Sequence, residues 1–310
     1  MRLPVNAQGL LVRSSLLDAG HSPAEINARV RAGDWLPVAR GIYLPEAALS
    51  EEERTVAWRR RAAVYRYRCL AQAAGGPVLS HQSAAAVLRL ELLRPDLTRI
   101  HVLSGRPTGG KIQRRRHIHV GDAGGTEVEV DGVVLTGPAR TAVDVAAAGT
   151  FAQALAVFDA ALARGVTREE LAEVLEQRRR PGHARTRFAL QHADGLSANP
   201  GESWGRAQII EAGLPVPRIQ VHYVLPDGSD AYTDYDWEGR LVGEFDGVEK
   251  YTRLRRPGES VADVVLREKR REDGLRALGL DVTRAIIADF EHDRWVPRVH
   301  GRLERLGLLR

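Results

Sequence analysis

Residues 233–251 read TDYDWEGRLVGEFDGVEKY and predict a β-hairpin that carries acidic side chains. Two short runs that alternate apolar and acidic residues flank a glycine, which is typical of two strands joined by a tight turn. A three-residue turn at 238–240, in which Gly239 is free to adopt a positive φ, places Asp234 directly opposite Glu244. A two-residue turn would send Asp234 to the other face of the sheet. We predict the three-residue turn.

This register places four acidic side chains on one face of the hairpin, namely Asp234, Asp236, Glu244 and Asp246. The Cβ atoms of Asp234 and Glu244 are expected roughly 4.5–5.5 Å apart. Carboxylates this close repel each other and raise a carboxyl pKa unless a cation lies between them. Mg²⁺ binds one or two carboxylates together with water and phosphate oxygens, and Mn²⁺ suits the same ligands. We therefore expect a Mg²⁺ centre that promotes phosphodiester hydrolysis.

The order of these motifs resembles that of the PD-(D/E)XK nuclease superfamily, in its very-short-patch-repair-like branch. A helix glutamate, Glu202, precedes the strand residue Asp234, and the E-x-D-G strand end follows at 244–247. A basic helix with the sequence EKRR at 268–271 comes next. The resemblance covers about residues 198–290 and implies a mixed sheet flanked by helices, with endonuclease activity.

The same resemblance implies roles for single residues. It assigns the metal to three carboxylates, those of Asp234, Glu244 and Asp246. Glu202 would complete the outer shell of the metal or orient water. Lys250 would neutralise the attacked phosphate or help to position water. Arg271 would reach the DNA backbone or pair with an acid.

One position departs from the superfamily pattern. Asp246 stands where most members have the catalytic lysine, which leaves the general base open. Lys250 could substitute only if the loop after Gly247 turns back toward the metal. The alternative is a salt-bridged hairpin in a degenerate nuclease that binds without cutting.

A second group of motifs lies in the first fifty residues. Residues 9–17 predict a short amphipathic helix. Residues 22–25, Ser-Pro-Ala-Glu, form a capping box with proline at the first helical position. Residues 35–44 predict a small hairpin. Two short helices followed by a hairpin describe a winged helix-turn-helix.

The stretch 9–44 resembles the N-terminal domain of AbiEi-type antitoxins, a DNA-binding winged helix often linked to autoregulation of its operon. The resemblance implies that the helix beginning at Ser22 enters the major groove. Its DNA-facing side chains would be Asn27, Arg29 and Arg31, with Arg40 on the wing. The alternative is that these are solvated residues of a small interaction domain.

The middle of the chain carries a basic loop between two predicted strands, 100–103 and 117–120. The loop holds no acid, and Arg114 and Arg115 within it are candidates for clamping a nucleic-acid backbone. Three histidines could share one face of these strands, namely His101, His117 and His119. Because no fourth ligand accompanies them, we do not predict a metal site there. The order of elements resembles the middle of long AbiEi-like proteins, where it joins the winged helix to a nuclease-like end.

Short-range sequence patterns in the middle region predict a helix cap, a hairpin turn and an ion pair. Ser80 is predicted as the N-cap of an alanine-rich helix. Glu129 to Val134 contain an Asp-Gly pair that predicts a hairpin turn. Arg140 and Asp144 lie at i, i+4 on a predicted helix and are expected to pair.

The composition restricts the function classes. The chain has 310 residues, of which 44% are hydrophobic and 27% charged, so it is globular rather than disordered. It contains neither a long uncharged apolar run nor a signal pattern, so we expect a cytoplasmic protein without a membrane span. The single cysteine excludes an internal disulfide and a Cys-based zinc site. Residues 1–196 carry a net charge of +7 and residues 197–310 one of −2, so the N-terminal part should attract DNA.

Together these patterns predict an α/β (α+β) chain of three domains. They are a winged helix-turn-helix at 1–50, an AbiEi-like α/β connector at 51–196 and a PD-(D/E)XK nuclease-like domain at 197–310. The predicted function is a Mg²⁺-dependent DNA endonuclease with a DNA-binding winged helix. The alternative is a non-catalytic AbiEi-like antitoxin or transcriptional repressor that retains a degenerate nuclease fold. The expected partners are DNA and a toxin or a second copy of the chain.

Overall fold

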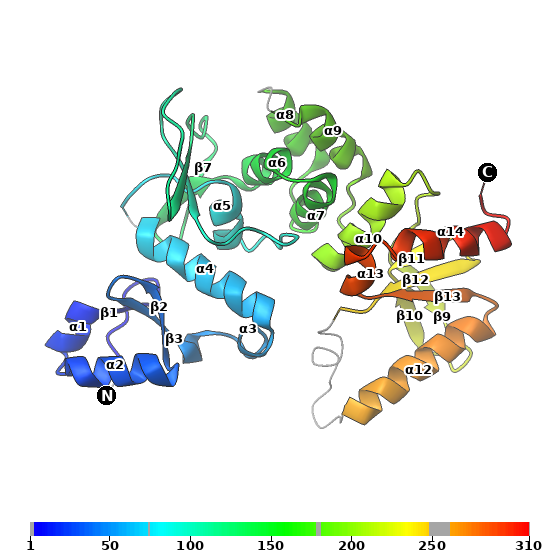
Figure 1. Cartoon of the computed structure of the whole chain (residues 1–310), viewed down its shortest axis with the longest axis horizontal. Coiled ribbons are helices and arrows are strands. Elements are labelled where there is room, and N and C mark those ends of the chain that lie inside the picture. The colour runs from blue at the N-terminus through cyan, green and yellow to red at the C-terminus, as the bar shows by residue number, and fades with distance from the viewer. Residues whose placement is uncertain (1–2, 74, 178–180, 248–260, 310) are drawn as a thin grey trace. The chain divides into compact units, whose positions relative to one another are not determined.

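The computed structural model describes residues 3–73, 75–177, 181–247 and 261–309. The chain is a mixture of helices and small sheets, which confirms the predicted α+β class (Figure 1). Its residues gather into two compact units. The first contains 1–145 with 169–178, and the second contains 146–168 with 179–310. The division into three named domains stays a prediction.

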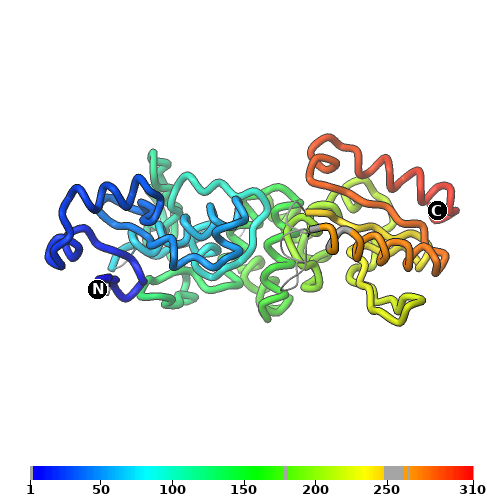
Figure 2. Tube along the Cα trace, turned by 90° about the horizontal axis from the view of Figure 1, so that it is seen from below, coloured from blue at the N-terminus to red at the C-terminus, as the bar shows by residue number. Residues whose placement is uncertain are grey.

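The first unit begins with a module of two short helices and three strands. The helices are α1 (Arg13–Asp18) and α2 (Pro23–Ala32), and the hairpin consists of β2 (Trp35–Ala39) and β3 (Ile42–Pro45). The strand β1 (Leu11–Val12) pairs antiparallel with β3. The blue part of Figure 2 follows this path from α1 to the hairpin. The module encloses a core of its own, made of Leu11, Leu16, Ile26, Trp35 and Tyr43.

The start of α2 confirms the predicted capping box. Glu25 N donates to Ser22 Oγ at 3.2 Å, and Ser22 N donates to a Glu25 carboxylate oxygen at 2.7 Å. The predicted helix over 9–17 is wrong in its first half. Leu11 and Val12 pair with β3 instead, so the helix begins at Arg13.

The module packs on α4, and a second sheet region follows. α3 (Glu51–Thr55) leads into α4 (Ala57–Ala73), whose Ala63 joins a core with Leu10, Val38 and Leu44. The elements that come next are α5 (His81–Val87), β4 (Ile100–Leu103), β5 (Lys111–Ile112), β6 (Arg116–His119), β7 (Glu127–Val130), β8 (Val133–Thr136), α6 (Pro138–Ala148) and α8 (Arg168–Glu176).

In this region β6 lies between β4 and β5, parallel to β4 and antiparallel to β5. The predicted basic loop is therefore shorter than expected, because Lys111 and Ile112 form a strand. The β7–β8 hairpin is confirmed, and Asp131 and Gly132 take the positive φ values of 51° and 74° that such a turn needs. The predicted Arg140–Asp144 ion pair is also present, at 2.7 Å.

The second unit is built around a three-stranded mixed sheet of order β11-β12-β13. β11 (Tyr235–Trp237) runs antiparallel to β12 (Leu241–Phe245), which is parallel to β13 (Asp281–Ala285). The other elements of this unit are α7 (Phe151–Leu162), α9 (His183–His192), α10 (Pro200–Glu211), β9 (Val221–Val224), β10 (Asp230–Thr233), α12 (Val261–Ala277), α13 (Ile287–Glu291) and α14 (Trp295–Arg305).

Helices cover both faces of this sheet, as Figure 1 shows. On one face the strands bury aromatic residues against α10, α13 and α14, in a core that includes Tyr235, Trp237, Phe290 and Trp295. On the other face α12 and the β9–β10 hairpin pack on Val242 and Val282. The sheet is therefore buried on both sides, which explains why all five residues of β12 are buried.

The β11–β12 register is the one predicted from the sequence. Asp236 pairs with Val242 and Trp237 with Leu241, which leaves a three-residue turn. Glu238 and Gly239 adopt φ values of 54° and 63° in that turn. The glycine supplies backbone freedom where the chain reverses.

Candidate functional site

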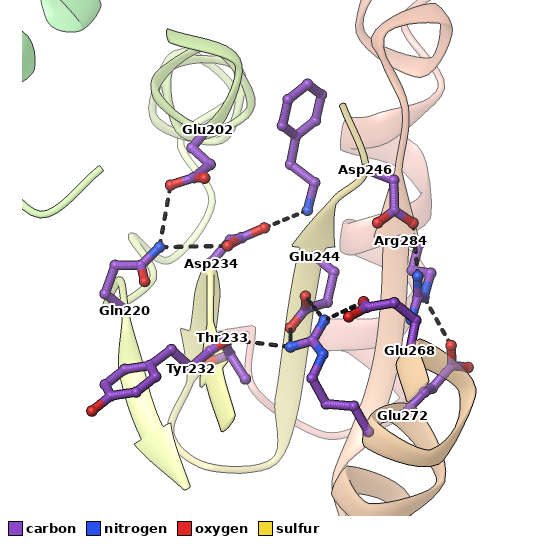
Figure 3. A network of polar contacts seen from close by, with 12 residues as sticks. Glu202, Gln220, Tyr232, Thr233, Asp234, Glu244, Asp246, Glu268, Glu272 and Arg284 are labelled. Atoms are coloured by element: carbon purple, nitrogen blue, oxygen red, sulfur yellow. Dashed lines mark hydrogen bonds and ion pairs between the residues drawn. The ribbon is translucent and has the colours of Figure 1, made fainter. Parts of the chain in front are cut away.

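The four acidic residues of the predicted site come from neighbouring elements of the second unit. Glu202 lies in the first turn of α10, and Asp234 stands immediately before β11. Glu244 lies within β12, and Asp246 follows that strand directly. Figure 3 shows the four side chains around the same end of the sheet.

The amide of Gln220 connects Glu202 with Asp234. Its Nε2 donates to Glu202 Oε2 at 3.2 Å and to Asp234 Oδ1 at 3.4 Å (Figure 3). Glu202 is buried and also accepts hydrogen bonds from Ala198 N at 2.8 Å and Asn199 Nδ2 at 2.7 Å. Sequence reasoning missed Gln220, because no spacing rule relates a glutamine before a strand to a helix glutamate.

Glu244 is neutralised by Arg271 of α12. Both Nη atoms of Arg271 donate to the Glu244 carboxylate, Nη1 at 3.3 Å and Nη2 more closely. Arg271 also donates to Glu268 at 3.3 Å and to the carbonyl of Tyr232 at 3.2 Å. Burial acts to lower the pKa of Arg271, but Glu244 and Glu268 raise it overall. Of the two roles expected for Arg271, the structure shows pairing with an acid.

Asp246 is neutralised in the same way by Arg284 of β13. Arg284 Nη1 donates to Asp246 Oδ2 at 2.8 Å, and its Nε lies 2.8 Å from a carboxylate oxygen of Glu272. Burial acts to lower the pKa of Arg284, but the charge of Asp246 raises it overall. The remaining acid, Asp234, accepts a hydrogen bond from Phe245 N at 2.6 Å.

These contacts bear on the expected carboxylate cage. Glu202 and Asp234 share the Gln220 amide, whereas Glu244 and Asp246 each pair with a guanidinium. Among the described residues, one group alone brings three metal-binding side chains within 4.8 Å of one another, and it consists of histidines elsewhere in the chain. In this arrangement the acids do not fit a bound Mg²⁺ or Mn²⁺ ion. Metal binding by Asp234, Glu244 and Asp246 stays a prediction, and Lys250 lies outside the described residues.

A buried ionic network fixes α10, the helix that carries Glu202. The Asp159 carboxylate of α7 accepts hydrogen bonds from Arg206 Nη2 at 2.7 and 2.8 Å and from Ser203 Oγ at 2.6 Å. Burial raises the pKa of Asp159 although Arg206 opposes that shift. From the sheet side, Tyr235 Oη donates to the Glu202 carbonyl at 2.7 Å.

Asp236 belongs to a separate structural cluster. It is 1% exposed and accepts hydrogen bonds from Arg218 Nε at 3.0 Å and Gly239 N at 3.2 Å, as well as from Tyr223 Oη. Burial and the Asp236 carboxylate raise the pKa of Tyr223. These contacts tie β11 to its own turn and to the β9 strand.

The residues expected to face DNA are on the surface of the N-terminal module. Ile26 of α2 is buried in the module core, whereas Asn27, Arg29 and Arg31 are exposed. Arg40, expected on the wing, is also exposed, between β2 and β3. Arg29 Nη1 lies 2.8 Å from Asp34 Oδ2, so part of its charge is already neutralised.

Arg114 and Arg115 are exposed at the turn between β5 and β6. The turn is closed by a hydrogen bond from Gln113 N to the Arg116 carbonyl at 2.8 Å. The hairpin therefore presents two adjacent cations on a defined backbone. None of the helices in the described part of the chain is long and apolar enough to cross a membrane.

Comparison with known proteins identifies a matching domain family and two related proteins. Residues 73–192 match the AbiEi antitoxin C-terminal domain, which confirms the AbiEi likeness for the middle of the chain. Two proteins of Mycobacterium tuberculosis, uncharacterized protein MT2308 of strain CDC 1551 and uncharacterized protein Rv2248 of strain H37Rv, are each 32% identical over 205 residues. The alignment covers 64% of this chain and 70% of each relative.

The fold and the domain match define a class, that of α+β proteins with an AbiEi-type antitoxin domain. Within it, the chain belongs to the family of the two mycobacterial proteins. The domain match ends at residue 192, so it does not extend to the acidic site of the second unit.

Proposed function

We propose that the chain is a non-catalytic AbiEi-type antitoxin that binds DNA through its N-terminal module and represses transcription. The observation that carries this proposal is the AbiEi antitoxin C-terminal domain at 73–192, which follows a helix–helix–hairpin module in the same chain. In this proposal the module is the winged helix, and a toxin is the protein partner.

The exposed side of α2 supports a role in DNA binding. Ile26 anchors the helix in the core, and the polar side chains of Asn27 and Arg31 point away from that core. Residues of a recognition helix contact base edges and phosphates in the major groove in this way. The capping box of Ser22 and Glu25 fixes the helix end that would approach the DNA.

The state of the acidic site supports a non-catalytic second unit. Glu244 and Asp246 are occupied by arginines from two other elements, so these carboxylates hold α12 and β13 against β12. Once two charges are buried as a pair, removing either partner is costly, so such pairs can hold elements together without a metal. The second unit is then a scaffold for partner binding.

Fluorescence anisotropy of a labelled duplex tests the proposal. The duplex is taken from the region upstream of the gene for this chain, and a shuffled duplex of equal length is the reference. We expect tighter binding to the upstream duplex, and weaker, less salt-dependent binding after charge reversal at Arg29 and Arg31. Arg305→Glu, an exposed position on α14, is the matched control. Equal binding by wild type and the Arg29/Arg31 variant would refute the placement of DNA on α2.

A second candidate function is a Mg²⁺-dependent endonuclease. The observation that favours it is the linkage of Glu202 and Asp234 through Gln220, at the same end of the sheet as Glu244 and Asp246. This function requires Arg271 and Arg284 to leave their carboxylates. Nicking of supercoiled plasmid in Mg²⁺ or Mn²⁺, abolished in both Asp234→Asn and Glu244→Gln, would support it. Wild-type protein that leaves plasmid and linear DNA intact in both metals would support the repressor.

A further inference from the structure

Three histidines gather in the AbiEi-type domain, away from the acidic site. The parallel strands β4 and β6 pair His101 with His117, and His119 lies two residues further along the same face of β6. One ring nitrogen from each histidine lies within 4.8 Å of the other two. His101 Nδ1 and His119 Nε2 are only 2.9 Å apart. The three histidines therefore share a face of the sheet, and their imidazole rings also lie close enough to form a cluster.

One ring nitrogen of the cluster, His101 Nε2, is buried without a hydrogen-bond partner among the described residues. His101 as a whole is 7% exposed. Buried polar groups are nearly always satisfied, and an unsatisfied one points to a missing ion, water or ligand. The backbone of His101 is held separately, because its N–H donates to Ser83 Oγ at 2.8 Å.

The electrostatic surroundings suit a cation that binds neutral imidazole. Burial lowers the pKa of His101 to about 4 and that of His119 to about 3. Neutral imidazole is the form of histidine that binds metals. Arg99, whose charge acts on His101, is itself ion-paired with Asp96.

His81 covers one side of the cluster from the start of α5. Its ring stacks on His119 with centroids 3.6 Å apart and planes 12° apart, and its backbone is left-handed with a φ of 49°. Ser80 Oγ lies 3.0 Å from His81 Nδ1, and the Ser80 side chain makes no hydrogen bond to the helix backbone. Ser80 is the N-cap residue of α5, as predicted, but its side chain lies against His81 instead of capping the helix backbone.

We propose that His101, His117 and His119 bind one divalent transition-metal ion of the zinc type, with a fourth position open to water. Imidazole nitrogens are common ligands for such ions, and three of them with an open position form a recurrent zinc geometry. Two nitrogens at tetrahedral zinc lie about 3.3 Å apart, so small ring rotations bring these atoms from their present spacing to the ion. The ion would connect β4 to β6.

Metal titration of the full chain tests this site. After treatment with EDTA and buffer exchange, Zn²⁺ binding is followed by calorimetry, and Co²⁺ binding by its visible ligand-field absorption. We expect one Zn²⁺ per chain and Co²⁺ bands of tetrahedral intensity. His117→Asn and His119→Asn should each weaken Zn²⁺ binding by at least ~100-fold and remove the Co²⁺ bands, since even residues behind the ligands change affinity 10–100-fold.

His300→Asn provides the control, because His300 is exposed on α14. It should bind both metals like wild type. Far-UV circular dichroism of each variant shows whether it is folded. Wild type without stoichiometric Zn²⁺ binding, or a folded His117→Asn variant with wild-type affinity, would overturn the proposal.

Discussion

Arg271 and Glu244 form a two-pronged ion pair between α12 and β12, in which both guanidinium Nη atoms donate to a carboxylate that is 1% exposed. The guanidinium neutralises a carboxylate that the nuclease resemblance assigns to a metal ion. This ion pair therefore bears both on the stability of the second unit and on its ability to cleave DNA.

The first prediction concerns the stability of this ion pair. Arg271→Ala should lower the free energy of unfolding by about 3–5 kcal/mol, because it removes the guanidinium that neutralises the buried Glu244 carboxylate. The measurement is urea unfolding monitored by tryptophan fluorescence. Arg276→Ala removes an ion pair with Glu272 from the same helix, but the Arg276 side chain is 53% exposed. That control should cost at most ~1 kcal/mol. A similar destabilisation in both variants would contradict a special role for Arg271.

The hairpin of the second unit was predictable from the sequence because its determinants are local. Side chains alternate along a strand, so the spacing of Asp234 and Glu244 around Gly239 fixes the register once the turn length is chosen. The capping box at Ser22 was predictable for the same reason. Such signals depend on neighbours within a few residues.

The chemistry of the acidic site was not predictable in the same way. Arg271 and Arg284 reach Glu244 and Asp246 from elements 27 and 38 residues further along the chain. No periodicity in the sequence shows whether a cation beside a carboxylate will be a metal or a guanidinium. The histidine cluster was half predictable, because alternation gave its shared face but the pairing of His101 with His117 required the tertiary fold.

The second prediction concerns the close approach of α10 to the sheet. A Cβ at Gly205 would collide with Tyr235 Oη and with Phe290 Cζ, the latter at 2.7 Å. Gly205→Ala should therefore destabilise the chain by about 1–3 kcal/mol, even though alanine favours a helix. Gly301→Ala in α14 meets only the end of the Arg305 side chain at 3.9 Å, and it should be neutral or slightly stabilising. Thermal unfolding of the two variants makes the comparison, and an unchanged Tm for Gly205→Ala would argue against this packing.

The third prediction concerns pH. Burial opposes the shift, but hydrogen bonds from Arg298 and from Ile286 N hold the pKa of Asp289 below its ordinary value of 3.8. A carboxyl whose pKa is lower in the folded state stabilises that state above its unfolded pKa, and this contribution disappears as the pH falls through the folded pKa. Asp289→Asn should therefore cost roughly 1.5–3 kcal/mol at pH 7 and less at pH 3. Urea unfolding at both pH values tests this, and a difference that stays constant would contradict it.

The last prediction separates backbone clamping from base recognition in DNA binding. Arg114 and Arg115 are exposed at the β5–β6 turn, and we expect them to bind phosphates, the commonest partners of arginine on DNA. The double variant Arg114→Ala/Arg115→Ala should weaken binding to the upstream and shuffled duplexes by the same factor. The slope of log K against log salt should fall by about 0.9 for each phosphate that the variant no longer neutralises, and Arg305→Ala should leave it unchanged. Weakening confined to the upstream duplex would instead indicate that these arginines read bases, and unchanged binding to both would remove them from the interface.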